Sequence, residues 1–162
     1  MQALKVLQNI LLRMQKHCSF YILSDAASER RLFFCCALIE KIYAQGNHKM
    51  TIHCQTQEDA IIFNDTLWTY KDISFIPHSL VGEEYHQKCP IQIGWTDSAS
   101  ASIEASNDIL ILLSISPTPP PFHTEFEHII EIVNQDPVIK DTLRTRYQHY
   151  RTCGYDIKTH TI

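Results

Sequence analysis

Four side chains near the C-terminus have the types and the spacing to bind an anion. Lys140, Arg144, Tyr147 and Arg151 recur at intervals of three and four residues. At about 100° per residue, a helix through this segment places the three cations within about 40° of one another and Tyr147 at their border with an apolar edge. Guanidinium groups bind carboxylates and phosphates bidentately, and a neighbouring aromatic ring can hold an apolar anchor. The stripe therefore suits an acidic peptide or a phosphate backbone, although a solvated helix face whose cations match the helix dipole has the same pattern.

Arg146 departs from this pattern, because it falls on the apolar side of the same helix. A buried guanidinium without a partner would be too costly in free energy. We therefore expect Arg146 either to pair with a buried carboxylate or to show that the helix is irregular.

Trp68 and Phe75 are a second candidate for binding. Trp68 ends the helix expected after Thr56, and Phe75 lies in the strand-like run that follows. Packing in the core is the ordinary role of two large aromatic side chains. If they are exposed, they are instead anchors of a protein interface, where Trp often carries much of the binding energy. The sequence leaves both readings open.

Motifs for catalysis are missing. A nucleotide-binding sheet needs glycines in its first strand-to-helix turn, but residues 24–28 read SDAAS, and no P-loop, G-x-G-x-x-G or G-x-S-x-G occurs. The loop Gly82-Glu83-Glu84, with His78 and His86 nearby, has the side chains for acid-base chemistry, but exposed loop residues explain it more simply. We predict neither a catalytic site nor a cofactor.

The cysteines read as buried, reduced thiols. Cys35 and Cys36 lie in the apolar run LFFCCALI, and a chain of 162 residues can build a core without disulfide staples. Reduced thiols imply a cytoplasmic location. No pair of cysteines has C-x-x-C spacing, and no ligand pair has the spacing of a zinc module, so no metal site is expected.

The charge is distributed unevenly along the chain. The net charge of −4 argues against a protein that coats nucleic acid with its whole surface. Residues 140–162, however, hold five Lys and Arg against two Asp and Glu, and no basic residue lies between Lys88 and Lys140. The protein is thus an acidic body with one basic segment.

Strand-like and helix-like patterns alternate along the chain. The expected strands are 19–23, 50–54, 73–76, 91–95 and 108–115, and the expected helices are 27–45, 56–68, 122–133 and one with Pro137 in its first turn. Residues 97–107 read as a surface loop, and the apolar strand after them should be covered on both faces. The pattern predicts a three-layer α/β fold: a Rossmann-like, mostly parallel sheet with helices on both faces and no glycine loop for a nucleotide.

The N-terminus is expected to be a helical extension. Leu4, Leu7, Ile10, Leu11 and Met14 recur at helical spacing, but Gln8 and Asn9 interrupt any secretory signal. No apolar run is long enough to cross a membrane. We expect residues 1–18 to be this extension, with Met14 as a conceivable native start, and residues 19–162 to be a single domain.

Five runs together resemble one protein family. They are FYIL at 20–23, DTLWTYKDISFIPHSLVGE at 65–83, PIQIGW at 90–95, DILILLS at 108–114 and RTRYQHYRTCGYDI at 144–157. In this order they are similar to the chi subunits of bacterial DNA polymerase III, over about residues 19–160. Residues 1–13 and the prolines at 119–121 depart from the family pattern.

The resemblance implies a non-catalytic accessory subunit of DNA replication, with a Rossmann-type sheet that holds no nucleotide. Its implied partners are the psi subunit of the clamp loader and the acidic C-terminal tail of single-stranded-DNA-binding protein, so that nucleic acid is met mainly indirectly. By resemblance, the tail site consists of Val133, Lys140, Arg144 and Tyr147, and the psi-facing surface includes Trp68 and Phe75. This tail site coincides with the stripe found from helical periodicity. The alternatives are a module that binds single-stranded DNA directly and a degenerate nucleotide-binding enzyme.

Overall fold

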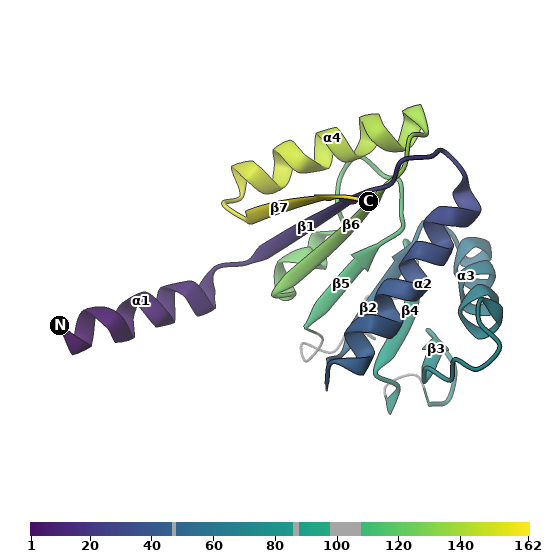
Figure 1. Ribbon diagram of the computed structural model, residues 1–162, viewed down its shortest axis with the longest axis horizontal. Helices are drawn as coiled ribbons and strands as arrows, with labels where there is room; N and C mark the ends of the chain where they lie inside the picture. The colour runs from purple at the N-terminus through teal and green to yellow at the C-terminus, as the bar shows by residue number, and fades with distance from the viewer. Residues whose placement is uncertain (47, 86–87, 98–107) are drawn as a thin grey trace.

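A seven-stranded parallel sheet forms the centre of the protein (Figure 1). The computed structural model describes residues 1–46, 48–85, 88–97 and 108–162, except for the side chains of residues 12–14. The strands lie in the order β3-β4-β2-β5-β6-β1-β7. They are β1 (His17–Ile22), β2 (Met50–Cys54), β3 (His78–Leu80), β4 (Ile91–Trp95), β5 (Ile109–Leu112), β6 (His128–Val133) and β7 (Asp156–Thr161).

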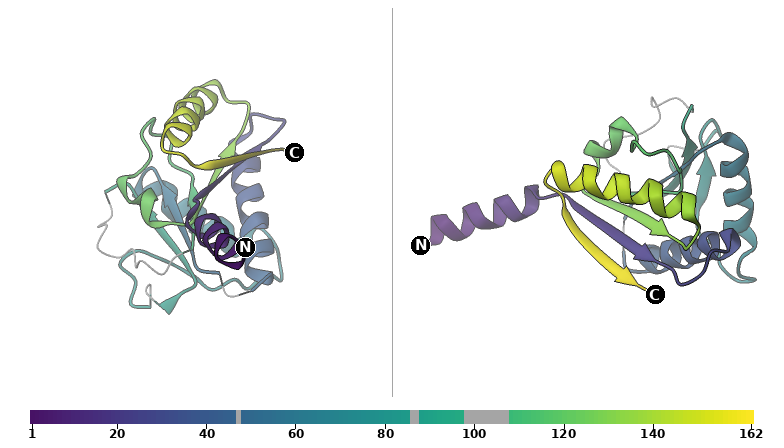
Figure 2. Two further views of the ribbon diagram at one scale, coloured as in Figure 1. Left: turned by 90° about the vertical axis from the view of Figure 1, so that its left-hand side faces the viewer. Right: turned by 90° about the horizontal axis from the view of Figure 1, so that it is seen from above.

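Helices cover both faces of the sheet (Figures 1 and 2). The helices α2 (Ser28–Ala44) and α3 (Gln57–Thr69) pack on one face, and α4 (Pro137–Thr152) and the short 3-10 helix η3 (Pro121–Glu125) pack on the other. Alternate residues of β5 serve the two cores: Ile109 and Ile111 face α2 and α3, whereas Leu110 and Leu112 face α4. The expected three-layer α/β architecture is confirmed, and every strand pairing in the described chain is parallel.

Capping residues set the starts of the two helices that matter most for binding. At α3, Thr56 Oγ1 accepts a hydrogen bond from the backbone N–H of Asp59 at 3.1 Å. At α4, Asp136 Oδ1 accepts from the backbone N–H of Val138 at 2.8 Å, and Pro137 stands at the first helical position. Gly154 adopts φ 82° just after α4, a left-handed conformation that lets the chain turn back into β7.

The prediction of a helix at 122–133 is wrong. Its first part forms η3, and residues 128–133 form β6 between β5 and β1. Ile129 faces the core under α4, whereas Ile130 and Ile132 face the core under α2. A strand buried on both faces reads as a continuous apolar run, and periodicity cannot separate such a run from a buried helix.

Three other boundaries differ from the expectation. Residues 73–76 form no strand; β3 begins only after Pro77, which lacks the N–H that a ladder needs. The final strand β7 has no counterpart in the expectation, because it stands at the end of the sheet, where four of its six residues are exposed and polar. β5 is shorter than the expected 108–115. The loop expected at 97–107 lies, but for Asp97, outside the described residues.

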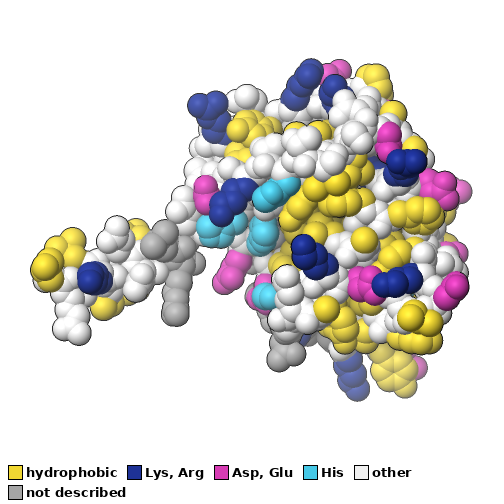
Figure 3. Space-filling view, in the orientation of Figure 1, with side chains coloured by type: hydrophobic (Ala, Val, Ile, Leu, Met, Phe, Trp, Pro, Cys, Tyr) yellow, Lys and Arg dark blue, Asp and Glu magenta, His cyan; other side chains and the backbone are white. Residues whose placement is uncertain are grey.

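The helix α1 (Gln2–Met14) extends away from the body (Figure 1). All its described side chains are exposed, and hydrophobic ones show on its surface (Figure 3). Gln15, which is extended, and Lys16 join it to β1, which begins two residues before the expected strand at Ser19. In the described part of the chain, no helix combines the length and the apolar character that a membrane span requires.

Candidate functional site

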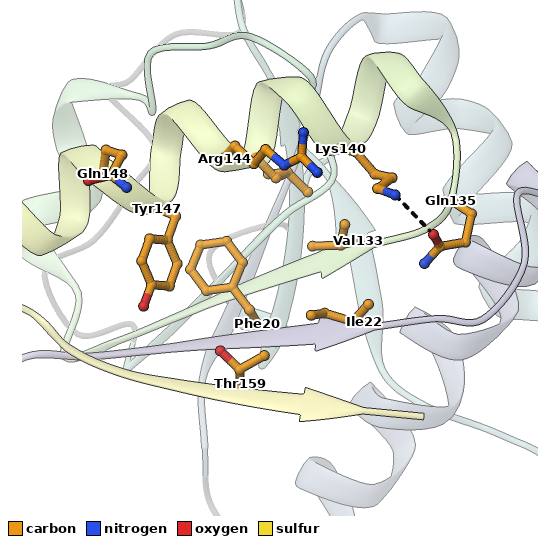
Figure 4. A pocket seen from close by; sticks show the side chains of 10 residues that line it. Phe20, Ile22, Val133, Gln135, Lys140, Arg144, Tyr147, Gln148 and Thr159 are labelled. Carbon is orange, nitrogen blue, oxygen red and sulfur yellow. Dashed lines mark hydrogen bonds between the residues drawn. The ribbon is translucent and has the colours of Figure 1, made fainter.

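A pocket of about 460 Å³ lies between α4 and one edge of the sheet, which consists of β6, β1 and β7 (Figure 4). Its sides and floor come from segments that are far apart in the sequence. The lining residues are Phe20, Ile22, Val133, Gln135, Lys140, Leu143, Arg144, Tyr147, Gln148 and Thr159.

Strand register and helical spacing bring these residues together. In the parallel pairing, Ile22 is the partner of Val133, and Phe20 is the partner of Thr159, so that three strands contribute to one floor. On α4, positions 140, 144 and 147 fall on one face, because residues three and four apart are neighbours on a helix. The pocket thus depends on α4 lying along the strands in one fixed position.

All four residues expected at the tail site line this pocket: Val133, Lys140, Arg144 and Tyr147. Lys140 is half-buried, and its Nζ donates a hydrogen bond to Gln135 Oε1 at 3.2 Å. The side chain of Arg144 is 73% exposed and lies 3.5 Å from Asp141 Oδ1. Arg151, the third cation of the stripe, is exposed on the last turn of α4 and does not line the pocket.

Aromatic rings pack against one another in the apolar part of the pocket. The ring of Tyr147 lies 5.4 Å from that of Phe20, which in turn contacts the ring of Tyr150 at 6.2 Å. Tyr147 is half-buried, whereas Phe20 and Tyr150 belong to the core under α4. Cations on the rim and an apolar floor beside them suit a ligand that carries both a carboxylate and a hydrophobic side chain.

Sequence reasoning missed the floor of the pocket apart from Val133, and it also missed Gln135. Phe20 and Ile22 lie two apart in an expected strand, which placed them on one face, but nothing in the sequence named the helix over that face. Gln135 directly precedes Asp136, the residue that caps the start of α4. No sequence signal marked Thr159.

Of the two expectations for Arg146, pairing with a buried carboxylate is the one that is confirmed. Its guanidinium pairs with Glu131 on β6, and neither side chain is exposed to solvent. Arg146 also donates from Nε to the carbonyl of Ser116 at 2.7 Å, and the hydroxyl of Tyr150 donates to Glu131 Oε1 at 2.8 Å. The helix α4 is therefore regular, and the ion pair holds it against β6.

Trp68 and Phe75 are exposed, which excludes the core reading. Trp68 is 51% exposed and Phe75 is 82% exposed, and Ile73 between them is 79% exposed. The ring of Trp68 rests on that of the buried His78, with centroids 4.4 Å apart. Since α3 packs on β3 and β4, these aromatics lie at the opposite end of the sheet from the pocket.

Two of the residues considered for catalysis, Glu83 and His78, form hydrogen bonds with the backbone. Glu83 accepts a hydrogen bond from the backbone N–H of Leu80 at 3.0 Å. His78 is not an exposed loop residue, because it is buried and its Nδ1 lies 2.6 Å from the carbonyl oxygen of Ile76. His86 lies outside the described residues.

A buried arginine occupies the carboxyl end of the central strands. Arg31 on α2 donates from Nε to the carbonyl of Ile132 at 2.9 Å and from Nη1 to that of Leu113 at 3.2 Å. These carbonyls follow β5 and end β6, where sheets of this class commonly bind ligands. Burial lowers the pKa of Arg31. Here a side chain of the protein itself donates hydrogen bonds to two backbone carbonyls at the ends of the strands.

The cysteines are free thiols, as expected, and four of the six are buried. Burial raises the pKa of Cys36 and of Cys54 to about 12, which keeps both thiols protonated and unreactive at neutral pH. Cys153, in contrast, is exposed. Within the described ranges, no three His, Cys, Asp or Glu side chains are grouped so that they could hold a metal ion.

Similarity to known proteins covers nearly the whole chain. The family described as DNA polymerase III chi subunit, HolC, matches residues 14–158. DNA polymerase III subunit chi of Escherichia coli is 30% identical over 149 residues, which span 90% of this chain and 98% of that protein. The subunit of the same name from Pseudomonas aeruginosa is 29% identical over 143 residues, spanning 88% of this chain and 94% of that protein.

Similarity to solved structures supports the fold. The crystal structure of T4 UvsW matches with a TM-score of 0.66 and 10% identity, over 93% of this chain and 42% of that one. At that identity the likeness concerns the fold alone. The family match, in contrast, includes the whole of β1, β6 and α4, which form most of the pocket, and it ends within β7. The chain therefore belongs to the family of DNA polymerase III chi subunits, which are accessory subunits of a DNA-replicating polymerase complex.

Proposed function

We propose that this protein is a non-catalytic adaptor within the polymerase complex. One surface binds the psi subunit of the clamp loader, and the pocket under α4 holds the acidic C-terminal tail of single-stranded-DNA-binding protein. The observation that carries the proposal is the convergence of Val133, Lys140, Arg144 and Tyr147 on one pocket with a cationic rim and an apolar floor.

The two parts of the pocket have separate tasks in this proposal. Arg144 and Lys140 take the carboxylates of the tail, while Tyr147 and Val133 flank its terminal aromatic side chain. Because the side chain of Arg144 is largely exposed, its attraction for the tail is screened by salt. The apolar contact depends much less on salt, so the tail keeps a fixed position while its affinity responds to ionic strength.

In this proposal, the psi-facing surface lies near the opposite edge of the sheet, at β3 and β4. Trp68, Ile73 and Phe75 expose apolar area near the end of α3 and in the segment after it. Exposed aromatic side chains are frequent anchors of protein interfaces. The distance between the two surfaces along the sheet supports simultaneous binding of both partners.

The deciding experiment is a titration of Arg144→Ala with a synthetic peptide of the tail sequence. We expect the affinity to fall about tenfold at low salt, because a charge-assisted hydrogen bond is lost. Arg151→Ala is the matched control, since Arg151 is an exposed cation of the same helix outside the pocket. Unchanged affinity of Arg144→Ala at low salt would contradict the proposal. So would tight binding of a bare single-stranded oligonucleotide that Arg144→Ala abolishes, since that result favours a direct DNA contact.

A further inference from the structure

Gln135 connects the pocket to the loop after β1. It is half-buried between the end of β6 and the cap of α4. Its backbone N–H donates to the carbonyl of Asp25 at 2.8 Å, and its side-chain Nε2 donates to the carbonyl of Leu23, also at 2.8 Å. The side-chain amide therefore joins the β1–α2 loop to the start of α4.

The partners of this amide allow only one orientation. The carbonyl of Leu23 can only accept a hydrogen bond, so the NH₂ group of Gln135 must face it. The ammonium of Lys140 can only donate, so the amide oxygen must face Lys140, at 3.2 Å (Figure 4). A flip of the amide would break both bonds. The oxygen that meets Lys140 is thus held in place by the backbone of the β1–α2 loop.

Gln135 holds Lys140 without neutralising it. A lysine side chain is long and flexible, and its loss of rotamer entropy opposes its fixation. An amide oxygen can fix the ammonium but carries no net charge, so the positive charge remains available for a ligand. Arg144 differs, because its partner Asp141 is a carboxylate. In the part of the chain that the structure describes, Lys140 forms no ion pair with a carboxylate.

We infer that Gln135 is a positioning residue for the acidic ligand of this pocket. It fixes the ammonium of Lys140 on the rim beside Val133 and Ile22, so that the pocket selects a carboxylate close to an apolar side chain. This inference rests on the proposed tail binding, and it assigns the selectivity to a residue that need not touch the ligand.

A double-mutant cycle tests the inference with the full-length protein and the tail peptide. Gln135→Met keeps the length of the side chain but removes both hydrogen bonds. We expect it to weaken binding about threefold in the wild-type background and to have no effect in the Lys140→Met background. Gln148→Met is the matched control, because Gln148 also lines the pocket but does not accept the hydrogen bond of Lys140. Its effect should be the same in both backgrounds.

Further measurements separate this inference from its alternatives. A loss of the same size in both backgrounds would overturn it, and so would unchanged affinity of Gln135→Met when Lys140→Met weakens binding. If Arg144→Ala and Lys140→Met both bind the peptide like the wild type, the proposed function itself fails. Gln135→Glu keeps an oxygen for Lys140 but adds a negative charge, so we expect it to bind the peptide more weakly than the wild type at low salt, with a smaller difference between the two at high salt. Thermal unfolding of each variant shows whether the fold is retained, and a loss of affinity without a drop in Tm supports positioning.

Discussion

Arg146 on α4 and Glu131 on β6 form an ion pair from which solvent is excluded: Nη1 lies 3.0 Å from Oε1 and 3.1 Å from Oε2. Burial raises the pKa of Glu131, against the opposing effects of Arg146 and the hydroxyl of Tyr150. Because α4 forms one side of the pocket, this pair fixes the helix that carries Lys140, Arg144 and Tyr147. The pair therefore links the stability of the domain to the geometry of the binding site.

Removal of one partner of this pair should destabilise the protein strongly. Arg146→Met leaves Glu131 buried without its counter-charge, which costs about 3–5 kcal/mol of the free energy of unfolding. Urea denaturation at neutral pH measures the loss. Replacing both partners, by Arg146→Met together with Glu131→Gln, should recover part of it, since no buried charge is then left alone. A cost below about 1 kcal/mol for the single variant would show that Glu131 does not remain a buried, unpaired charge, either because it takes up a proton or because water reaches it.

A neutral histidine joins the same network. Ser114 Oγ accepts a hydrogen bond from Arg146 Nη2 at 3.0 Å and lies 3.2 Å from Nδ1 of the buried His53. The hydroxyl of Ser114 can accept from a protonated Nδ1 of His53 or donate to an unprotonated one, so this hydrogen bond forms with either neutral tautomer of the imidazole. Burial, and next the charge of Arg146, lower the pKa of His53 to about 4.

His53 should make the stability of the protein depend on pH. A histidine with a lowered pKa in the folded state stabilises the fold fully above its unfolded pKa of about 6.5 and loses this contribution as the pH falls toward 4. Between pH 7 and pH 5 the loss is about 2 kcal/mol. His53→Gln should reduce the drop in unfolding free energy over this interval by that amount, measured by urea denaturation at both pH values. The exposed His48 is the control: His48→Gln should show the pH dependence of the wild type, and an equal change in both variants would exclude His53 as the cause.

Asp141 is expected to weaken tail binding. Its carboxylate lies 3.5 Å from Arg144 Nη1 on the surface and competes with an acidic ligand for that cation. Asp141→Asn should raise the affinity for the tail peptide about two- to threefold at low salt, with little effect on stability, because exposed ion pairs contribute little. The gain should vanish in the Arg144→Ala background. A gain of the same size there would mean that Asp141 acts only through the overall charge.

The exposed aromatic side chains should be dispensable for folding but required for binding the psi subunit. Phe75→Ala removes a side chain that is 82% exposed, so we expect a change in unfolding free energy within about 0.5 kcal/mol. Co-purification of the psi subunit should fall sharply, while the affinity for the tail peptide stays unchanged. Phe33→Ala, which alters a partly exposed Phe on α2, is the control. Retention of the psi subunit by Phe75→Ala would place the interface elsewhere.

Local signals in the sequence were reliable where they act over a few residues. Thr56 marked the start of α3 and Pro137 the first turn of α4, and helical periodicity on α4 placed Lys140, Arg144 and Tyr147 on one face. Periodicity also indicated that Arg146 needs a buried partner. It failed for β6, because a strand buried on both faces leaves no alternation to read.

The sequence by itself determined the α/β class, the cationic face of α4 and the resemblance to chi subunits. The tertiary structure decided which segments meet: that Glu131 is the partner of Arg146, that Phe20 and Thr159 form the floor under Tyr147, and that Trp68 is exposed. The reason is physical. Caps and helix faces depend on neighbours within one or two turns, whereas a pocket floor depends on the register of parallel strands, which joins residues more than a hundred positions apart.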